Sequence, residues 1–336
     1  MYNLKLLIGI DIGATWTRVA LSKPSGEVLS RTSFKTPRSG GRRTVAEAII
    51  DEVKRSLSKH LHNVEAIGVG TIGPLDLSSG IVFNAANLPI KTFDVAQPLM
   101  EELGKPVIMA NDCTAAVWGE YVFGVGKNVE NLIYVTISTG IGGGVIVDGN
   151  LLVGKSGNAH EIGHIVVDAS GKMTCGCGGR GHWEAYSSGA NMPRLASRLI
   201  EEWSLSNLEK MSKVYESYTS NNLSPELIYA EAKNNDLLAL RILLEVNKYN
   251  AAGFESIINT YDPELITIGG SIALNNPELV IEPIVSYLKN TKGLLTQFPS
   301  IRQTELGGDI VLIGAIALAA MPPRNLLKRL KYLSEK

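Results

Sequence analysis

One pattern occurs twice along the chain and restricts what it can fold into: an apolar strand, a turn that contains glycine, and a second strand. Residues 6–11 form the first apolar run, and the alternating residues 17–21 follow it. Residues 132–138 and 144–147 repeat the arrangement. Because helical segments lie between the strands of each half, the sequence predicts α/β sheets covered by helices. We therefore expect two related α/β halves that face each other across a ligand cleft.

Local signals predict the other elements of the first half. A strand is expected at residues 28–33, and short buried strands are expected at 66–70 and 107–110. A helix is expected to begin with Thr44, which would form a capping box with Glu47. The first half therefore contains several strands and at least one helix that covers them.

The second half contains the long helical region of the chain. Helix is expected from about residue 192 to 258, with a break near 221–225. A buried strand is expected at 265–268, and residues 310–318 are expected to form a last short strand that turns into helix.

The domain bounds follow from the repeat, since no linker rich in serine and glycine separates the halves. We expect an N-terminal domain at residues 1–120, completed by a C-terminal helix at 314–336. The second domain is expected at 121–313, with a metal-binding loop and a helical insert.

The composition excludes several classes of protein. Of the 336 residues, 45% are hydrophobic and 19% are charged, and no run approaches the roughly 20 apolar residues that cross a membrane. The formal net charge is -1, so no general basic field exists to hold nucleic acid, and the basic stretch 324–331 is typical of a solvated helix face. Asp11 interrupts the apolar start of the chain, which argues against a signal peptide. We expect a cytoplasmic protein that binds neither nucleic acid nor membrane.

Each repeat carries a turn that suits a phosphate group. In the first turn Gly13 lets backbone N–H groups approach an anion, and Thr15 adds a hydroxyl donor. Asp11 can hold magnesium there, directly or through water. The second turn offers Thr139 and Gly140 in the same way. A single glycine turn is also what a β-hairpin needs, so the prediction of a polyphosphate site depends on finding two of them at equivalent points.

Other nucleotide motifs are missing or misplaced. The chain has no Gly-x-x-x-x-Gly-Lys-Ser/Thr sequence, which disfavours a P-loop enzyme. Residues 68–73 match Gly-x-Gly-x-x-Gly as text, but Pro74 follows and no helix is expected to begin there. A dinucleotide site is therefore not expected.

A carboxylate follows the apolar strand 107–110 at its carboxyl end, the edge where open α/β sheets bind ligands. A sugar hydroxyl is a poor nucleophile, and Asp112 is predicted to accept its proton as a general base. Asn111 can both donate to and accept from a polyol. The alternative is that Asn111 and Asp112 only cap the helix expected at 114–122.

Four possible metal ligands occur in the order His164, Cys175, Cys177 and His182. Two nitrogens and two sulfurs complete a tetrahedral zinc set with no open position, which indicates a structural metal. The chain contains only three cysteines, too few for a disulfide framework. The alternative is two unrelated thiols and surface histidines.

Acidic residues flank these ligands. A metal would bring Glu161 and Glu184 together, and two converging carboxylates suit the hydroxyls of a sugar. His160, Glu161 and His164 also match the text of a zinc protease motif. That motif requires a helix, and Gly163 with the apolar residues after it argues against one.

Taken together, these motifs resemble the ROK family (repressors, open reading frames and kinases) of the hexokinase, Hsp70 and actin superfamily. The Asp-x-Gly-x-Thr turn, the Asn-Asp pair, the Thr-Gly-x-Gly-Gly-Gly turn, the Glu-x-Gly-His segment and the Cys-x-Cys-Gly-x-x-Gly-x-x-Glu segment occur in the family's order. The last two are specific to ROK proteins, and the resemblance spans nearly the whole chain. It implies two ribonuclease-H-like (actin-like ATPase) domains around a central cleft.

The resemblance also implies a role for each matching residue. Asp112 would be the catalytic base. The other sugar contacts would be Gly73, Asn87, Asn111, Glu161, His164 and Glu184. The phosphate contacts would be Gly13, Thr15, Thr139 and Gly140, with Gly269 and Gly270 on the adenosine side. The zinc ligands would be His164, Cys175, Cys177 and, where the family usually has a third cysteine, His182.

The implied function is that of a sugar kinase that transfers the γ-phosphate of ATP to a hexose, with Mg²⁺ and a structural Zn²⁺, in a homodimer or higher homo-oligomer. Glucose is the expected sugar, as the commonest substrate of ROK kinases with these motifs. N-acetylmannosamine, N-acetylglucosamine and other hexoses stay open.

Two rival functions belong to other classes. The DNA-binding members of the family carry a helix-turn-helix ahead of the first glycine turn, and only ten residues precede Asp11 here, so a repressor is not expected. A sugar-responsive regulator without catalysis would not need Asp112 and both phosphate turns.

Overall fold

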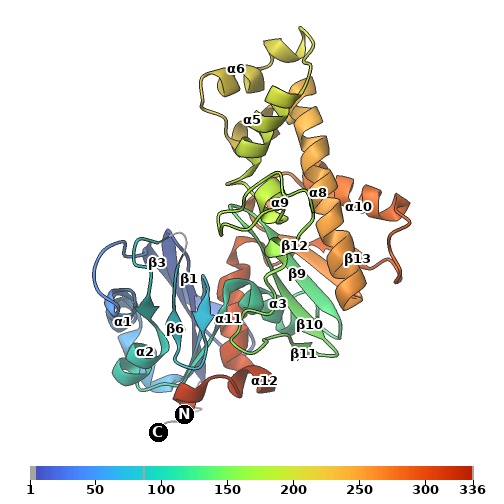
Figure 1. Cartoon of the computed structure of the whole chain (residues 1–336). Coiled ribbons are helices and arrows are strands. Elements are labelled where there is room, and N and C mark those ends of the chain that lie inside the picture. Colours follow the sequence, from blue (N-terminus) through green and yellow to red (C-terminus); the bar gives the residue numbers. More distant parts are fainter. Residues whose placement is uncertain (1–4, 86–87, 335–336) are drawn as a thin grey trace. The chain divides into compact units, whose positions relative to one another are not determined.

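The computed structural model describes residues 5–85 and 88–334 (Figure 1). The chain divides into two compact units. The first unit combines Met1–Tyr134, Gly144–His160 and Thr304–Lys336, and the second combines Val135–Gly143 and Glu161–Gln303. The chain therefore passes between the units several times.

The first unit is built on a mixed five-stranded sheet of order β3-β2-β1-β4-β8. Its strands are β1 (Leu6–Ile12), β2 (Trp16–Ser22), β3 (Val28–Lys35), β4 (Val64–Thr71) and β8 (Val107–Asn111). β1, β4 and β8 run parallel, whereas β2 is antiparallel to β1 and to β3. Every residue of β1 is buried, because helices cover both faces of the sheet at its centre.

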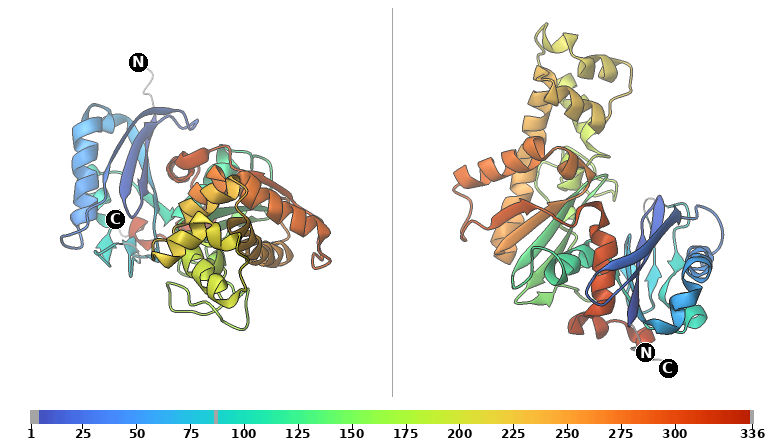
Figure 2. Two further views of the ribbon diagram at one scale, coloured as in Figure 1. Left: turned by 90° about the horizontal axis from the view of Figure 1, so that it is seen from above. Right: turned by 180° about the vertical axis from the view of Figure 1, so that it is seen from behind.

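Helices on the two faces of this sheet come from distant parts of the chain (Figures 1 and 2). α1 (Thr44–Leu57) and α2 (Ala96–Leu103) lie on one face, and α3 (Asp112–Val122) and α11 (Ile310–Ala320) lie on the other. A small antiparallel sheet of order β5-β6-β7 completes the unit. The remaining elements are β5 (Leu75–Asp76), β6 (Ile81–Val82), β7 (Phe93–Asp94), α12 (Arg324–Leu327), and the 3-10 helices η1 (Ser58–Asn63), η4 (Gly307–Asp309) and η5 (Lys331–Leu333).

A second five-stranded sheet has the order β11-β10-β9-β12-β13. Its strands are β9 (Leu132–Ile137), β10 (Ile141–Val147), β11 (Asn150–Leu151), β12 (Leu265–Gly269) and β13 (Ser300–Gln303). The helical elements of this half are η2 (Ile162–His164), α4 (Glu184–Ser187), α5 (Met192–Glu202), η3 (Glu209–Met211), α6 (Lys213–Thr219), α7 (Pro225–Lys233), α8 (Leu237–Tyr261), α9 (Ser271–Asn275) and α10 (Pro277–Asn290). Mixed sheets with helices confirm the predicted α/β class.

The prediction of a strand within residues 310–318 is wrong, because α11 is helical from Ile310 to Ala320. The run is apolar on all sides, so its sequence has no period that separates helix from strand. Burial on both sides explains the composition: α11 packs between the sheet and α3, and Gly314 lies so close to Ala115 that a Cβ would come within 2.0 Å of its carbonyl oxygen. Among the described residues, no helix combines the length and the apolar character needed to span a bilayer.

At two further elements the structure differs from what the sequence indicated. The helix α1 does begin at Thr44, but its N-cap is Arg43 and no side chain caps it, so the capping box with Glu47 does not form. The strand β13 was not predicted, because three of its four residues are exposed and its polar sequence lacks the apolar run of a buried strand.

Replacing Gly68 by alanine is expected to unfold the first unit more readily. A Cβ there would lie 1.8 Å from the carbonyl oxygen of Ala315, because β4 touches the backbone of α11 at this point. Overpacking of a rigid core contact costs about 3 kcal/mol, which urea denaturation would measure. Gly41→Ala is the control, since its Cβ would meet nothing within 4 Å. Equal midpoints for both variants would contradict the close packing of β4 on α11.

Candidate active site

The first glycine turn joins β1 to β2 in the first unit. The N–H of Gly13 donates to the carbonyl of Trp16 at 3.0 Å, and a Cβ on Gly13 would lie 2.9 Å from that oxygen, so the turn needs glycine. Thr36 holds the turn: its hydroxyl donates to the carbonyl of Gly13 at 2.7 Å, and its N–H donates to the carbonyl of Thr15 at 3.0 Å. These carbonyl oxygens accept hydrogen bonds from Thr36, so their partial negative charge is compensated and does not repel a bound phosphate.

Asp11 is held by Arg18, a residue that the sequence interpretation missed. The carboxylate of Asp11 is 5% exposed and accepts from Nε of Arg18 at 2.8 Å and from Nη2 at 2.6 Å. Nη1 of Arg18 reaches Asp309 at 3.1 Å. The sequence contained part of the information needed to predict this ion pair, because Asp11 pairs directly with Arg18 in a hairpin that turns at residues 13–15. The contact to Asp309 joins segments far apart in the chain and carries no local signal.

One cavity of about 500 Å³ in the first unit brings the glycine turn and Asp112 together. Its lining residues are Asp11, Gly13, Thr15, Trp16, Arg18, Ser33, Asp112 and Val311. Burial raises the pKa of Asp11 to about 6. Arg18 opposes this rise and the nearby carboxylate of Asp112 adds to it, since two negative charges repel. The cavity therefore combines two carboxylates, one guanidinium and a turn suited to phosphate.

Asp112 is the first residue of α3, which begins directly at the end of β8. Asn111 caps the helix, because its Oδ1 accepts from the N–H of Cys113 at 2.9 Å and of Thr114 at 3.4 Å. The capping interpretation is thus correct for Asn111. Oδ1 of Asp112 accepts from Cys113 at 2.8 Å. The positive end of a helix stabilises a carboxylate placed there.

Gly73 lies against the amide of Asn111. A Cβ on Gly73 would be 3.3 Å from Nδ2 of Asn111, so two of the predicted sugar contacts are neighbours within the first unit. Asn87, another predicted contact, lies outside the described residues.

The second glycine turn lies at the start of β10 in the second unit. The N–H of Gly189 donates to the carbonyl of Ser138 at 2.8 Å, and that of Ala190 donates to the carbonyl of Thr139 at 3.0 Å. The carbonyls of this turn are therefore also bonded within the protein. Gly140 faces Glu184, whose Oε2 would be 2.7 Å from a Cβ at this position.

The turn at Gly269 and Gly270 lies beside the second glycine turn. Gly270 has a positive φ of 88°, and a Cβ would lie 2.5 Å from the carbonyl oxygen of Ile137. The hydroxyls of Ser138 and Ser271 are 3.2 Å apart. The residues predicted to contact the phosphates and the adenosine side are thus neighbours in the second unit.

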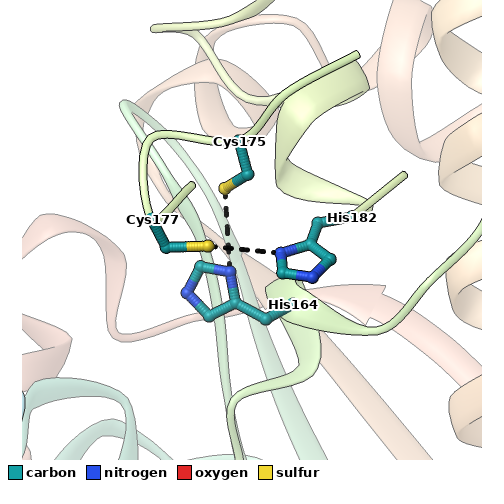
Figure 3. Close-up of side chains that lie close together, drawn as sticks. All are labelled: His164, Cys175, Cys177 and His182. Carbon is teal, nitrogen blue, oxygen red and sulfur yellow. Dashed lines mark hydrogen bonds between the residues drawn. The ribbon is translucent and has the colours of Figure 1, made fainter. Parts of the chain in front are cut away.

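The four predicted metal ligands converge in the second unit (Figure 3). His164, Cys175, Cys177 and His182 each place a ligand atom within 4.8 Å of all the others. The sulfur of Cys175 is 3.7 Å from Nδ1 of His164, and the sulfur of Cys177 is 3.3 Å from Nδ1 of His182. In tetrahedral zinc sites with bonds of about 2.0–2.3 Å, ligand atoms lie roughly 3.3–3.8 Å apart. The side chains present therefore fit a closed four-coordinate zinc site.

The loop between these ligands is shaped for His182. A Cβ on Gly179 would lie 2.1 Å from Cε1 of the His182 ring, so only glycine lets the imidazole take this position. The N–H of Gly179 points at the sulfur of Cys177, 3.5 Å away. A hydrogen bond to sulfur is the type of outer contact that steadies a thiolate ligand.

Glu161 and Glu184 flank the cluster. Oε2 of Glu161 lies 3.8 Å from Nε2 of His164, on the side of the ring opposite the cluster. Burial raises the pKa of Glu161, His164 opposes the rise, and the Glu184 carboxylate adds to it. Oε2 of Glu184 accepts from the N–H of Ile141 at 3.0 Å, and Oε1 lies 3.4 Å from the sulfur of Cys175. Glu184 therefore joins the second glycine turn to the metal cluster, a link that the sequence did not indicate.

His160 does not join the metal cluster. It is 2% exposed, and its Nε2 lies 2.6 Å from the hydroxyl of Thr114 in α3. His164 lies in η2, a short 3-10 helix, and residues 160–164 contain no α-helix. The arrangement of a zinc protease motif is therefore absent from these residues.

The family model named "ROK family" matches residues 7–321 of the chain. The chain belongs to the ROK family. A glucokinase of Pyrobaculum calidifontis is 43% identical over 321 residues, which cover 96% of this chain and 97% of that protein.

Solved ROK structures agree with this assignment. The ROK hexokinase of Thermus thermophilus superposes with a TM-score of 0.77 at 29% identity, covering 95% of this ROK chain and 99% of the other. A ROK family glucokinase of Streptomyces griseus, solved in complex with glucose and AMPPNP, gives a TM-score of 0.72 at 30% identity, covering 94% and 99%.

Lowering the pH is expected to destabilise the loop that carries the metal ligands of this ROK protein, because Asp168 becomes protonated. Burial disfavours its charge, but hydrogen bonds from Ser170 and Tyr186 outweigh burial and lower its pKa to about 2. A lowered folded-state pKa contributes stability above the unfolded value of about 3.9, and this is lost as the pH falls toward 2. Asp168→Asn should lower stability by about 1–2 kcal/mol at pH 7, the cost of weakening hydrogen bonds to a charged group.

The measurement is thermal unfolding of wild type and Asp168→Asn between pH 7 and pH 3. The gap between the two melting temperatures should narrow as the pH falls. Asp51→Asn, an exposed change on α1, should show no gap at any pH. A constant gap for Asp168→Asn would contradict the role of its charge.

Proposed function

We propose that this chain is an ATP-dependent glucokinase in which Asp112 accepts the proton of the 6-hydroxyl of glucose. The observation that carries the proposal is the cavity that Asp112 shares with Asp11 and Thr15 of the first glycine turn. A phosphoryl-transfer site needs a base and a phosphate-binding turn in one place. The likeness to glucokinases over nearly the whole chain supports the same function.

Asp112 is suited to the base because it lines the same cavity as the first glycine turn. Its Oδ1 accepts from the N–H of Cys113, which fixes the orientation of the carboxylate. In-line transfer to a sugar oxygen then passes the hydroxyl proton to the carboxylate as the new P–O bond forms and the bond from the γ-phosphorus to the bridging oxygen breaks, which leaves ADP. Asn111 is held by its capping bonds, which orient its amide Nδ2 for a sugar oxygen next to Gly73.

The nucleotide would be held by the glycine turns. Gly13, Thr15, Thr139 and Gly140 would contact its phosphates, and Gly269 and Gly270 its adenosine side. Mg²⁺ would be held by Asp11, directly or through water, and would spread the charge of the transferring phosphoryl group. Arg18 keeps one positive charge beside Asp11 and so limits the repulsion between Asp11 and Asp112.

The other sugar contacts besides Asp112 are proposed to be Gly73, Asn87, Asn111, Glu161, His164 and Glu184. Zn²⁺ would be held by His164, Cys175, Cys177 and His182, and would act by fixing the loop because four ligands leave no open position. With Nδ1 turned to the cluster, His164 presents Nε2 on the side of Glu161.

We further propose that the chain forms two ribonuclease-H-like domains around a cleft, with bounds at residues 1–120 and 121–313 and the helix 314–336 added to the first. The protein is proposed to be a homodimer or higher homo-oligomer in the cytoplasm. The strand order of each sheet and the ROK membership support the first of these proposals.

A sugar panel tests the proposed function. Purified chain with ATP and Mg²⁺ should release ADP when glucose is added, measured in a coupled assay, and kcat/KM for glucose should exceed that for mannose, N-acetylglucosamine and N-acetylmannosamine. A higher value for another hexose would move the assignment to that sugar. No ADP release with any sugar, together with measurable sugar binding, would favour the non-catalytic regulator instead.

A further inference from the structure

His160 is a buried histidine that neither the metal cluster nor the proposed reaction uses. Its Nε2 lies 2.6 Å from Oγ1 of Thr114 and 3.2 Å from the carbonyl oxygen of Gly157. Thr114 is also buried, at 3% exposed. All three residues belong to the first unit.

The two contacts of Nε2 indicate which ring nitrogen of His160 carries the proton. A carbonyl oxygen only accepts, so Nε2 must carry a hydrogen to approach Gly157 favourably. The hydroxyl oxygen of Thr114 then accepts from the same N–H. Burial makes this contact costly to lose, because a polar group without a partner in the interior pays its full desolvation penalty.

The two hydrogen-bonded residues, Thr114 and His160, are both close in sequence to residues of the proposed site. Thr114 is in the first turn of α3, two residues after Asp112, and its N–H is held by the Asn111 cap. His160 is the last residue of the first unit before the chain passes into the second unit at Glu161. Consecutive Cα atoms are about 3.8 Å apart, so anchoring His160 also limits where Glu161 can be.

The segment before His160 has a second anchor. The amide of Asn158 donates to the carbonyl of Leu75 at 3.2 Å, and its Oδ1 accepts from the N–H of Leu75 at 3.4 Å. Leu75 begins β5, two residues after Gly73. Residues 157–160 are thus bonded on one side to the strand after Gly73 and on the other to the helix that carries Asp112.

We propose that His160 is a positioning residue, which through its hydrogen bond to Thr114 fixes the point at which the segment 161–164 begins. The inference depends on the proposed function, since it assigns Glu161 and His164 to the sugar. It predicts that the bond affects glucose more than ATP, because no nucleotide contact proposed above lies in the anchored segment.

The test is steady-state kinetics on His160→Phe, Thr114→Val and the double variant. Each single variant is expected to raise KM for glucose about tenfold, equivalent to about 1.4 kcal/mol, with KM for ATP within twofold of wild type. The double variant should be no worse than the single ones, because both remove the same bond. His160→Gln, whose amide N–H can reach the position of Nε2, should recover most of the loss.

A matched control is Thr267→Val in β12. Thr267 is fully buried and its hydroxyl has no hydrogen-bond partner among the residues that the structure describes, so the same substitution removes no bond to them. KM for glucose should not change. If the His160 and Thr114 variants fold, by circular dichroism, and keep the wild-type KM for glucose, the inference is wrong. Equal rises in KM for both substrates would show a merely structural role. An inactive wild type would instead refute the proposed function.

Discussion

Asp112→Asn is expected to lower kcat by about 10²–10⁴-fold, the range that general-base catalysis contributes. Asparagine keeps the shape of the side chain and an oxygen that can accept from the N–H of Cys113, so the start of α3 should be preserved. What is lost is the negative charge and, with it, the ability to take a proton. KM for ATP and the affinity for glucose should therefore stay within a few-fold of wild type.

Binding and turnover must be measured separately for this variant. Glucose affinity is obtained by calorimetry, and kcat by the coupled ADP assay. Asp148→Asn is the control: Asp148 is exposed in the turn between β10 and β11 with a φ of 50°, a conformation that asparagine tolerates. A turnover close to wild type in Asp112→Asn, with glucose bound, would show that another group is the base.

Cys175→Ser is expected to lose the bound metal and much of the stability of its loop. Serine removes one of the two thiolates, and the zinc content should fall from about one ion per chain to nearly none. A ligand that binds only the folded state stabilises it by about 4 kcal/mol at a thousandfold excess over Kd, so the loss should appear as a lower unfolding midpoint. The second unit should be affected first, because Cys175 and Glu184 are in contact there.

Cys113→Ser provides the matched control, since Cys113 is buried in α3 outside the cluster. It should keep its zinc. Metal content is measured by mass spectrometry after dialysis, and unfolding by circular dichroism with and without chelator. A chelator should lower the midpoint of the wild type and leave that of Cys175→Ser unchanged. Full zinc content in Cys175→Ser would contradict the ligand assignment.

Local patterns predicted the elements where side-chain periodicity and burial agree. The strands β1, β4 and β12 could be predicted as short apolar runs, and the helix α1 could be predicted because its apolar residues recur with the helical period. α11 could not, since a helix buried on all sides has no polar face to reveal its period. The capping box expected at Thr44 is also missing, because a local sequence propensity does not determine which atoms meet in the folded protein.

The candidate site divides in the same way. Spacing within one loop was enough to group Cys175, Cys177 and His182, because a short segment can bring its own ligands together. The pairing of Arg18 with Asp11 could have been derived from the length of the turn between them. Nothing local indicated that Glu184 bonds the backbone of Ile141, or that His160 bonds Thr114.

The order of motifs along the chain was sufficient to determine the family and to predict which residue types would form the site. These depend on side-chain identity and on short-range geometry, which the sequence contains. The tertiary structure alone decided that His160, the other histidine of the segment 160–164, bonds Thr114 of α3. It also decided that β4 approaches the backbone of α11 at Gly68. Such contacts join residues far apart in sequence, and their energies depend on packing that no local pattern encodes.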